Sequence, residues 1–314
     1  GGAFSFGGSS AWTESTNGSL CSYTSPNYSY IFPGSNITNL KANFGWGRIY
    51  TENLTFALTP VLASVANGSY LISITFHYNF LYLMTDGTTG LFSETTFGGG
   101  TKTPIAVVIS QSKNLAAALE NTSSSGGSYY SGQVNSSVVN IPSFTSWTGL
   151  STFTSDGADG YKFTWEASGS ADGTTIKANE QTGYPDFYSA AHYTPTLPAG
   201  KTLTGSIVGK KWFLPSLGEV LMIYPALKDI DTSAGFYARD MGGGMVDPTY
   251  WQLGMYSPIL PSGMASMAFR QVNGVLPTGL MITSSQSDTG YSIMANYWIE
   301  IGAYSGGVRP FIHY

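Results

Sequence analysis

The chain has 314 residues, of which 10% are charged, and its formal net charge at pH 7 is −5. An average soluble domain carries roughly 25% charged residues, so hydroxyl and amide groups must supply much of this surface, as is typical of a β-rich extracellular protein. A hydrophobic content of 42% argues against intrinsic disorder, and the 13 scattered Lys and Arg residues argue against nucleic-acid binding.

The single cysteine, Cys21, excludes a disulfide within the chain. Residues 1–20 are polar and glycine-rich, so we interpret Cys21 as a buried or incidental thiol rather than a lipid-anchored residue. No run of about 18 apolar residues occurs, so we predict no membrane span. We identify no signal segment in this chain and expect it to be a mature or trimmed form.

The first part of the chain predicts a small all-β, sandwich-like module after a flexible lead at residues 1–25. The dipeptide Pro33-Gly34 predicts a turn, and Asn67-Gly68 predicts a two-residue hairpin loop. Short alternating runs predict strands at residues 28–32, 48–50, 54–58, 61–65 and 70–76.

The middle of the chain mixes strands, helices and turns. The apolar run 104–109 predicts a buried strand, and the alanine-rich stretch 113–121 predicts a short helix. A Ser/Gly/Asn-rich surface excursion should follow at 121–146, and Asp159-Gly160 should form a turn. A second helix is expected near residue 185, because Pro185 suits a first helical turn, and a loop should follow at 197–200.

A strand at residues 210–213 should lead into a capped helix. Ser216 fits the N-cap position, and Glu219 three residues later completes a capping box. Leu217, Leu221, Tyr224 and Leu227 recur at helical spacing, which predicts one buried face. Beyond this helix we expect strands at residues 250–251, 265–270 and within 279–314.

The sequence of residues 212–219, WFLPSLGE, resembles the W-x-L-P-(S/T)-x-x-E signature of a C-type-lectin-like domain found in Bacteroidetes cell-surface proteins. Further matches occur in the order that the family shows. These are a turn at 85–88, the strand 104–109, a tyrosine- and alanine-rich helix at 184–191 and a closing Val308-Arg309-Pro310.

Residues 54–65, LTFALTPVLASV, are similar to a strand of fimbrillin-like pilus subunits. The two resemblances together imply an α+β protein. Its small N-terminal β-rich module would span residues 1–76, and a C-type-lectin-like domain with few helices and mixed antiparallel sheets would span 77–314.

Catalytic and metal-binding patterns are weak. His77, His192 and His313 are far apart in the sequence, no G-x-S-x-G elbow occurs, and no pair of carboxylates stands out. The Glu-Pro-Asn and Trp-Asn-Asp strings of calcium-binding lectins do not occur either. We therefore predict neither an enzyme nor a metal or cofactor site.

Ligand binding is expected near the end of the chain. The family's W-(T/S)-S-(S/T)-(E/Q) string reads ITSSQ at residues 282–286, with Ile282 in place of tryptophan. Aromatic rings with polar tips suit both sugar stacking and protein anchoring, although alternate strand residues must face the core. The candidate ligand-binding residues are Trp251, Tyr256, Gln286, Asp288, Tyr291, Asn296, Tyr297, Trp298, Glu300 and Tyr304.

The resemblances imply an extracellular adhesin at a cell surface or pilus tip. It would bind a host or dietary glycan or a protein non-covalently, and it would join other pilus subunits by strand addition. Three alternatives stay open at this point. They are a structural pilus or surface subunit without its own ligand, a diversified display protein, and a secreted glycan-processing enzyme.

Overall fold

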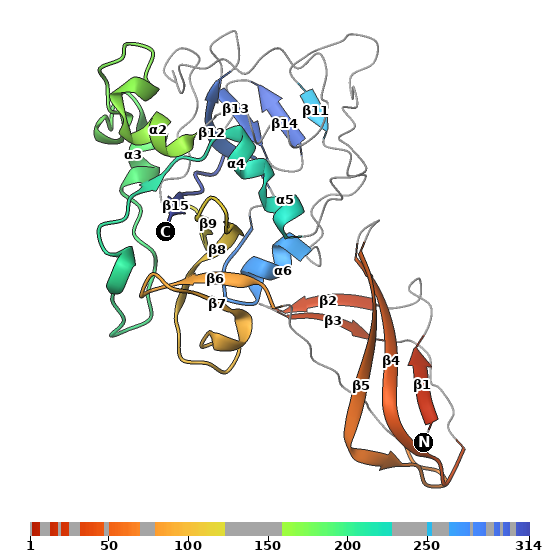
Figure 1. Cartoon of the computed structure of the whole chain (residues 1–314). Coiled ribbons are helices and arrows are strands. Elements are labelled where there is room, and N and C mark those ends of the chain that lie inside the picture. The colour runs from red at the N-terminus through yellow and green to blue at the C-terminus, as the bar shows by residue number, and fades with distance from the viewer. Residues whose placement is uncertain are drawn as a thin grey trace, which may run out of the picture.

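The computed structural model describes thirteen segments of the chain, shown in colour in Figure 1. They are residues 2–6, 13–17, 20–24, 32–46, 50–69, 79–122, 159–227, 250–252, 264–276, 279–286, 292–295, 298–301 and 306–314. Strands β1 to β5 pair only with one another in these segments, and β6 to β15 form two separate sheets. The predicted boundary between residues 76 and 77 lies outside the described residues.

A three-stranded sheet in the order β1-β4-β5 dominates the N-terminal part. Its strands are β1 (Gly2–Phe6), β4 (Asn36–Trp46) and β5 (Tyr50–Ala63), and β2 (Thr13–Asn17) and β3 (Leu20–Thr24) form a hairpin. The prediction of a flexible lead at residues 1–25 was therefore wrong for β1, β2 and β3. Parallel pairing with β4 supplies backbone hydrogen bonds to β1, and this long-range pairing could not be predicted from the glycine-rich local sequence.

Strand β5 is one long strand where the sequence predicted two. The break predicted between the strands 54–58 and 61–65, which contains Pro60, is instead a shift of the register between β4 and β5, from Asn39 opposite Ala57 to Ile37 opposite Leu62. An outer strand tolerates a proline in such an irregularity because the missing N–H does not interrupt a central ladder. The predicted strand 28–32 is wrong at Phe32, which lies outside any strand, and residues 28–31 and 70–76 are not described.

The predicted turn at Pro33-Gly34 is confirmed, whereas the turn predicted at Asn67-Gly68 is centred one residue earlier, on Ala66 and Asn67. Pro33 and Gly34 lie in a turn, and Gly34 has a φ of 80°. Asn67 has a φ of 60°, and the Gly68 N–H donates to the Val65 carbonyl at 3.1 Å. The second strand of the expected hairpin lies outside the described residues.

A six-stranded sheet in the order β10-β15-β9-β8-β6-β7 organises the second part, and all of its described pairings are antiparallel. Its strands are β6 (Leu81–Met84), β7 (Thr89–Leu91), β8 (Pro104–Ser110), β9 (Leu115–Ala118), β10 (Trp212–Phe213) and β15 (Phe311–His313). The buried strand expected at 104–109 is confirmed as β8. The expected turn at 85–88 is confirmed too, because Thr88 N–H donates to Asp86 Oδ1 at 2.9 Å.

The helix predicted at residues 113–121 is wrong, because Leu115–Ala118 forms β9 in the interior of this sheet. Asn114 has a φ of 49°, which turns the chain sharply between β8 and β9. All four residues of β9 are buried. Burial between neighbouring strands thus overrides the helical propensity of alanine.

A four-stranded antiparallel sheet in the order β11-β14-β13-β12 lies above α4 (Leu217–Leu221) in Figure 1. It contains β11 (Tyr250–Gln252), β12 (Met281–Gln286), β13 (Ser292–Ala295) and β14 (Trp298–Ile301). These strands and β15 confirm the expectation of terminal strands after residue 279. The predicted strand 265–270 is wrong, because α6 (Met264–Arg270) occupies it. Its buried Ala265, Ala268 and Phe269 have helical spacing.

The remaining helices are short, and their ends follow local sequence signals. They are α2 (Gly160–Trp165), α3 (Pro185–Ala191), α4 (Leu217–Leu221) and α5 (Ile223–Ala226), with 3-10 turns η2 (Phe92–Glu94), η3 (Ala167–Gly169), η4 (Lys177–Asn179) and η5 (Gly205–Ile207). The capping box is confirmed: Glu219 N–H donates to Ser216 Oγ at 3.3 Å, and Ser216 N–H to Glu219 Oε2 at 2.7 Å. Asp159-Gly160 is not a turn, because Asp159 is the N-cap of α2.

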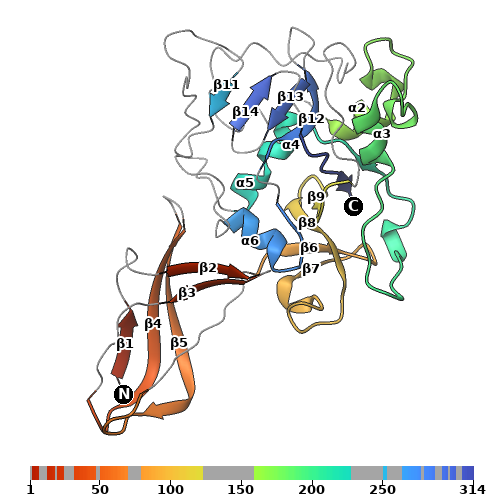
Figure 2. The same cartoon turned by 180° about the vertical axis from the view of Figure 1, so that it is seen from behind.

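The six-stranded sheet is covered on both faces. Tyr82 and Phe311 belong to a core that contains α4, α5 and α6, whereas Leu83 and Ile312 belong to a second core under residues 193–207. Figure 2 shows α5 and α6 beside β8 and β9 from behind. This part of the chain is therefore α+β with antiparallel sheets and few helices. Among the described residues, no helix has the length and apolarity needed to cross a membrane.

The predicted Val308-Arg309-Pro310 segment is buried beside this core. Arg309 is 1% exposed. It donates from Nε to Asn121 Oδ1 at 2.9 Å, from one terminal nitrogen to the Ala118 carbonyl at 2.6 Å and from the other to the Val275 carbonyl. A guanidinium with fixed donors can satisfy several carbonyls at once, so Arg309 joins three separate segments.

Candidate functional site

The structure describes the backbone of four predicted ligand-binding residues. Trp251 lies in β11, Gln286 ends β12, and Trp298 and Glu300 lie in β14, so all four belong to one sheet. Trp298 lies opposite Gln252, and Trp251 lies opposite Ile299. The two tryptophans on these neighbouring strands are therefore offset by one residue. The other predicted residues lie outside the described segments: Tyr256, Asp288, Tyr291, Asn296, Tyr297 and Tyr304. A ligand surface on this sheet stays a prediction.

The string at residues 282–285 has a structural use. Ile282, Thr283, Ser284 and Ser285 are all buried. Ser285 Oγ accepts a hydrogen bond from Leu217 N–H at 2.9 Å, and Ser284 N–H donates to the Pro215 carbonyl at 2.7 Å. The string therefore fastens β12 to the start of α4, and the protein itself covers these side chains.

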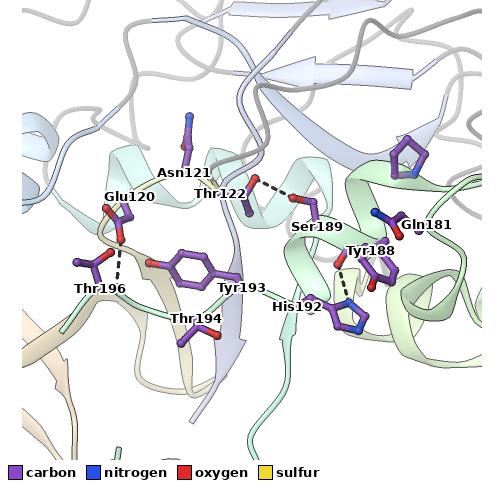
Figure 3. Close-up of a pocket in the computed structure, with 11 residues that line it drawn as sticks. Glu120, Asn121, Thr122, Gln181, Tyr188, Ser189, His192, Tyr193, Thr194 and Thr196 are labelled. Carbon is purple, nitrogen blue, oxygen red and sulfur yellow. Dashed lines mark hydrogen bonds between the residues drawn. The ribbon is translucent and has the colours of Figure 1, made fainter. Parts of the chain in front are cut away.

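An open pocket of about 620 Å³ lies elsewhere, between the end of β9 and α3 (Figure 3). Residues 120–122 form one wall, α3 forms a second, and the chain that follows α3 completes it. Its lining residues are Glu120, Asn121, Thr122, Gln181, Pro185, Tyr188, Ser189, His192, Tyr193, Thr194 and Thr196. Sites for small ligands have volumes of roughly 300–1,000 Å³, so this pocket has a suitable size.

Side chains on two walls of the pocket bind each other. Ser189 donates from its hydroxyl to Thr122 Oγ1 at 2.9 Å, which connects α3 to the segment after β9. Glu120 Oε1 accepts from Thr196 N–H at 3.3 Å. These contacts hold the walls together while leaving amide, hydroxyl and carboxylate groups along the lining.

Aromatic rings supply the apolar part of the lining. The rings of Tyr188 and His192 stack with their centroids 3.9 Å apart and an interplanar angle of 23°. Tyr193 packs edge-on against Trp212 at 4.9 Å and points its hydroxyl toward Glu120 (Figure 3). Burial raises the pKa of Tyr193, and the nearby Glu120 charge raises this pKa further, so the phenol stays protonated as a hydrogen-bond donor.

Among its described residues, the pocket lining contains one acidic side chain, that of Glu120, and no Lys or Arg. Sequence reasoning did not select these residues as a site, although it did identify the helix near residues 184–191. The two segments that line the pocket, 120–122 and 181–196, come together only when β9 and α3 pack. No local sequence pattern predicts this contact.

A second cluster brings together Asp159, Glu219 and His313, whose ligand-type atoms lie within 4.8 Å of one another. His313 Nε2 is 3.9 Å from Asp159 Oδ1. The His313 ring stacks on Phe213, with centroids 5.0 Å apart. These residues are 60 and 94 positions apart along the chain, and the sequence analysis did not single out this combination of two carboxylates and a histidine.

The three groups of this cluster change one another's pKa. Burial raises the pKa of Glu219 to about 7, and the Asp159 charge also raises it, against the Ser216 N–H, which lowers it. Burial alone would lower the pKa of His313, but the Asp159 carboxylate and the Glu219 charge outweigh burial and raise it. The nearby His313 lowers the pKa of Asp159.

The chain matches no protein-family model, no curated protein sequence and no solved structure. The lectin-like and fimbrillin-like resemblances therefore stay predictions from sequence. What the site offers must be argued from its own residues.

Proposed function

We propose that the protein is an extracellular adhesin, at a cell surface or pilus tip, which binds a glycan or protein ligand non-covalently. The observation that carries this proposal is the open pocket beside α3, with its stacked Tyr188 and His192 rings and its polar rim. Aromatic faces take up the apolar faces of sugars or side chains, while amides and hydroxyls pair with hydroxyl groups. No covalent step is required of any lining residue.

The pocket walls support binding without large rearrangement. Ser189 and Thr122 bridge two walls, and Glu120 is held by the Thr196 backbone. Preorganised polar groups lose little freedom when a ligand binds. In this proposal the pocket supplies one ligand site, and the sheet with Trp251 and Trp298 supplies a second surface that awaits a test.

Binding of the full chain to an array of glycans and matrix proteins, with and without a chelator, tests the proposal. Tyr188→Ala removes half of the aromatic stack, and Phe97→Ala is the matched control because Phe97 is 46% exposed and outside the pocket lining. We expect saturable binding that Tyr188→Ala weakens about 10-fold or more, which corresponds to the roughly 1.4 kcal/mol or more that such an aromatic contact contributes. No binding at all, or equal binding by both variants, would reject the pocket as an adhesive site.

A structural pilus subunit is the second candidate function. Strands β1 and β5 are the outer strands of the described three-stranded sheet, and β5 is 14 residues long. A long outer strand is a template for strand addition from another chain. Retention of the full chain on immobilised pilus subunits, lost when Lys is placed at Val61, would favour this candidate.

A further inference from the structure

Three elements far apart in the sequence meet at the Asp159–Glu219–His313 cluster. Asp159 precedes α2, Glu219 lies in the first turn of α4, and His313 ends β15. Glu219 is 5% exposed, while His313 and Asp159 are partly open to solvent, with side chains 35% and 50% exposed. The cluster is therefore anchored on one side and accessible on the other.

Both carboxylates also hold helix starts, which leaves room for a further role. Asp159 Oδ1 accepts from Tyr161 N–H at 2.9 Å, and Glu219 Oε2 accepts from Gly160 N–H at 3.2 Å. A carboxylate offers about four lone-pair positions over two oxygens. Helix capping and ligation of a cation are thus compatible on the same side chain.

The orientation of His313 is fixed by its other nitrogen. Nδ1 lies 3.0 Å from the Lys113 carbonyl, which can only accept, so Nδ1 carries the proton of this contact. In the neutral ring Nε2 then presents a lone pair toward Asp159. A histidine that donates one N–H to a backbone carbonyl and uses its other nitrogen as a ligand is the usual arrangement in metal sites.

The charges also favour a cation. The Asp159 and Glu219 carboxylates lie within 4.8 Å of each other, and Glu219 is buried, so two negative charges there repel each other. A divalent cation between them would remove this repulsion. One imidazole nitrogen with two carboxylate oxygens suits Zn²⁺ and related transition-metal ions rather than Ca²⁺, which prefers six to eight oxygens.

We propose that Asp159, Glu219 and His313 form a site for a single divalent transition-metal cation, with Zn²⁺ as the first choice. The ion would tie β15 to the starts of α2 and α4, and water would complete its coordination on the open side. The ligand atoms lie within 4.8 Å of one another. Tetrahedral Zn²⁺ ligands lie about 3.4 Å apart, so small side-chain adjustments would bring the three ligand atoms to this spacing.

Two substitutions remove a ligand but keep the helix caps. Asn caps helices as well as Asp does, so Asp159→Asn keeps α2 capped, and Glu219→Gln keeps the capping box. His313→Phe keeps a ring against Phe213 and removes the nitrogen ligand. His192→Gln is the matched control, because His192 is an exposed histidine outside the cluster that would account for adventitious Zn²⁺ binding.

Calorimetric titration of the full chain with zinc chloride, after dialysis against a chelator, tests the proposal. We expect one equivalent of Zn²⁺ to bind to the wild-type chain and to raise its Tm. The Kd for Zn²⁺ should be at least about 10-fold weaker in Asp159→Asn and Glu219→Gln, and unchanged in His192→Gln. Circular dichroism verifies that each variant is folded, and His313→Phe replaces any that is not. Absence of saturable binding, equal affinity in the ligand variants, or loss of binding in His192→Gln would overturn it.

Discussion

The polar groups of the second part fall into two contrasting arrangements, closed junctions and an open pocket. At the closed junctions, buried Arg309 and Lys177 donate hydrogen bonds to backbone carbonyls and to the Asn121 amide oxygen. In the pocket, groups of the same chemistry line a space of about 620 Å³. Asn121 belongs to both, because it accepts from Arg309 and also lines the pocket. Polar residues thus hold the fold together at the buried junctions, whereas in the pocket they line a space that is open to ligands.

The largest expected effect on stability comes from removing the guanidinium of Arg309. Arg309→Met leaves the Ala118 and Val275 carbonyls and the Asn121 amide without their donor. Unpaired buried polar groups cost about 1–3 kcal/mol each, so we expect the free energy of unfolding to fall by about 3 kcal/mol or more. Urea unfolding measures it, with exposed Lys201→Met as the control. A loss below about 1 kcal/mol would contradict the closed-junction account.

A smaller effect is expected at the capping box when metal is excluded with a chelator. Glu219→Ala removes the acceptor of both the Ser216 and Gly160 N–H groups. We expect unfolding free energy to fall by about 1–2 kcal/mol. Glu219→Gln, which keeps an acceptor, should lose less than half of this. Thermal unfolding of the two variants, measured side by side, tests this prediction. Equal losses of unfolding free energy in both variants would show that the cap contributes little.

Lys177 gives the closed junctions a pH signature. Nζ donates to the Gly169 carbonyl at 2.6 Å and to the Phe163 carbonyl at 3.2 Å, and burial lowers the pKa of Lys177 to about 8 from 10.5. Between pH 8 and 10.5 the unfolded chain therefore binds more protons at this site than the folded chain. The Lys177 contribution to stability should rise with pH across this window, and it is at its least favourable below pH 8.

The measurement is urea unfolding of wild type and Lys177→Met at several pH values between 8 and 10.5. The difference in unfolding free energy should shift in favour of wild type by about 1 kcal/mol per pH unit. Taking the difference removes the titration of the other lysines and tyrosines. A constant difference would show that Lys177 titrates alike in the folded and unfolded states.

The smallest effect on stability is expected in the pocket. Tyr188→Ala removes a partly buried ring at the edge of an open pocket, so unfolding free energy should change by less than about 1 kcal/mol. Ligand binding should change far more, as proposed above. A loss of stability comparable to that of Arg309→Met, measured by the same urea titration, would place Tyr188 among the residues that hold the fold.

Features with a strong local signal could be predicted from the sequence. Ser216 and Glu219 carry a capping box within four residues, and Pro185 marks the start of α3. Alanine-rich residues 115–118 and 265–270 were assigned the wrong way round. In each case neighbouring elements decided the outcome: β9 is buried inside a sheet, and α6 buries Ala268 and Phe269 against the core.

The candidate sites were harder to predict because they form only through tertiary packing. Glu120 and Tyr193 face one pocket, and Asp159 and His313 approach to 3.9 Å, although long stretches of chain separate them. Local patterns report one element at a time. The conspicuous Trp and Tyr residues near the end of the chain drew attention, while the ordinary Thr, Ser and Glu residues of the pocket did not.

A crystal structure of the full chain with the tightest ligand from the array tests the central claim most directly. The account predicts ligand density in the pocket, against the Tyr188 and His192 rings and within hydrogen-bonding distance of Glu120 or Asn121. Ligand density on the four-stranded sheet around Trp251 and Trp298, with the pocket filled only by water, would contradict it.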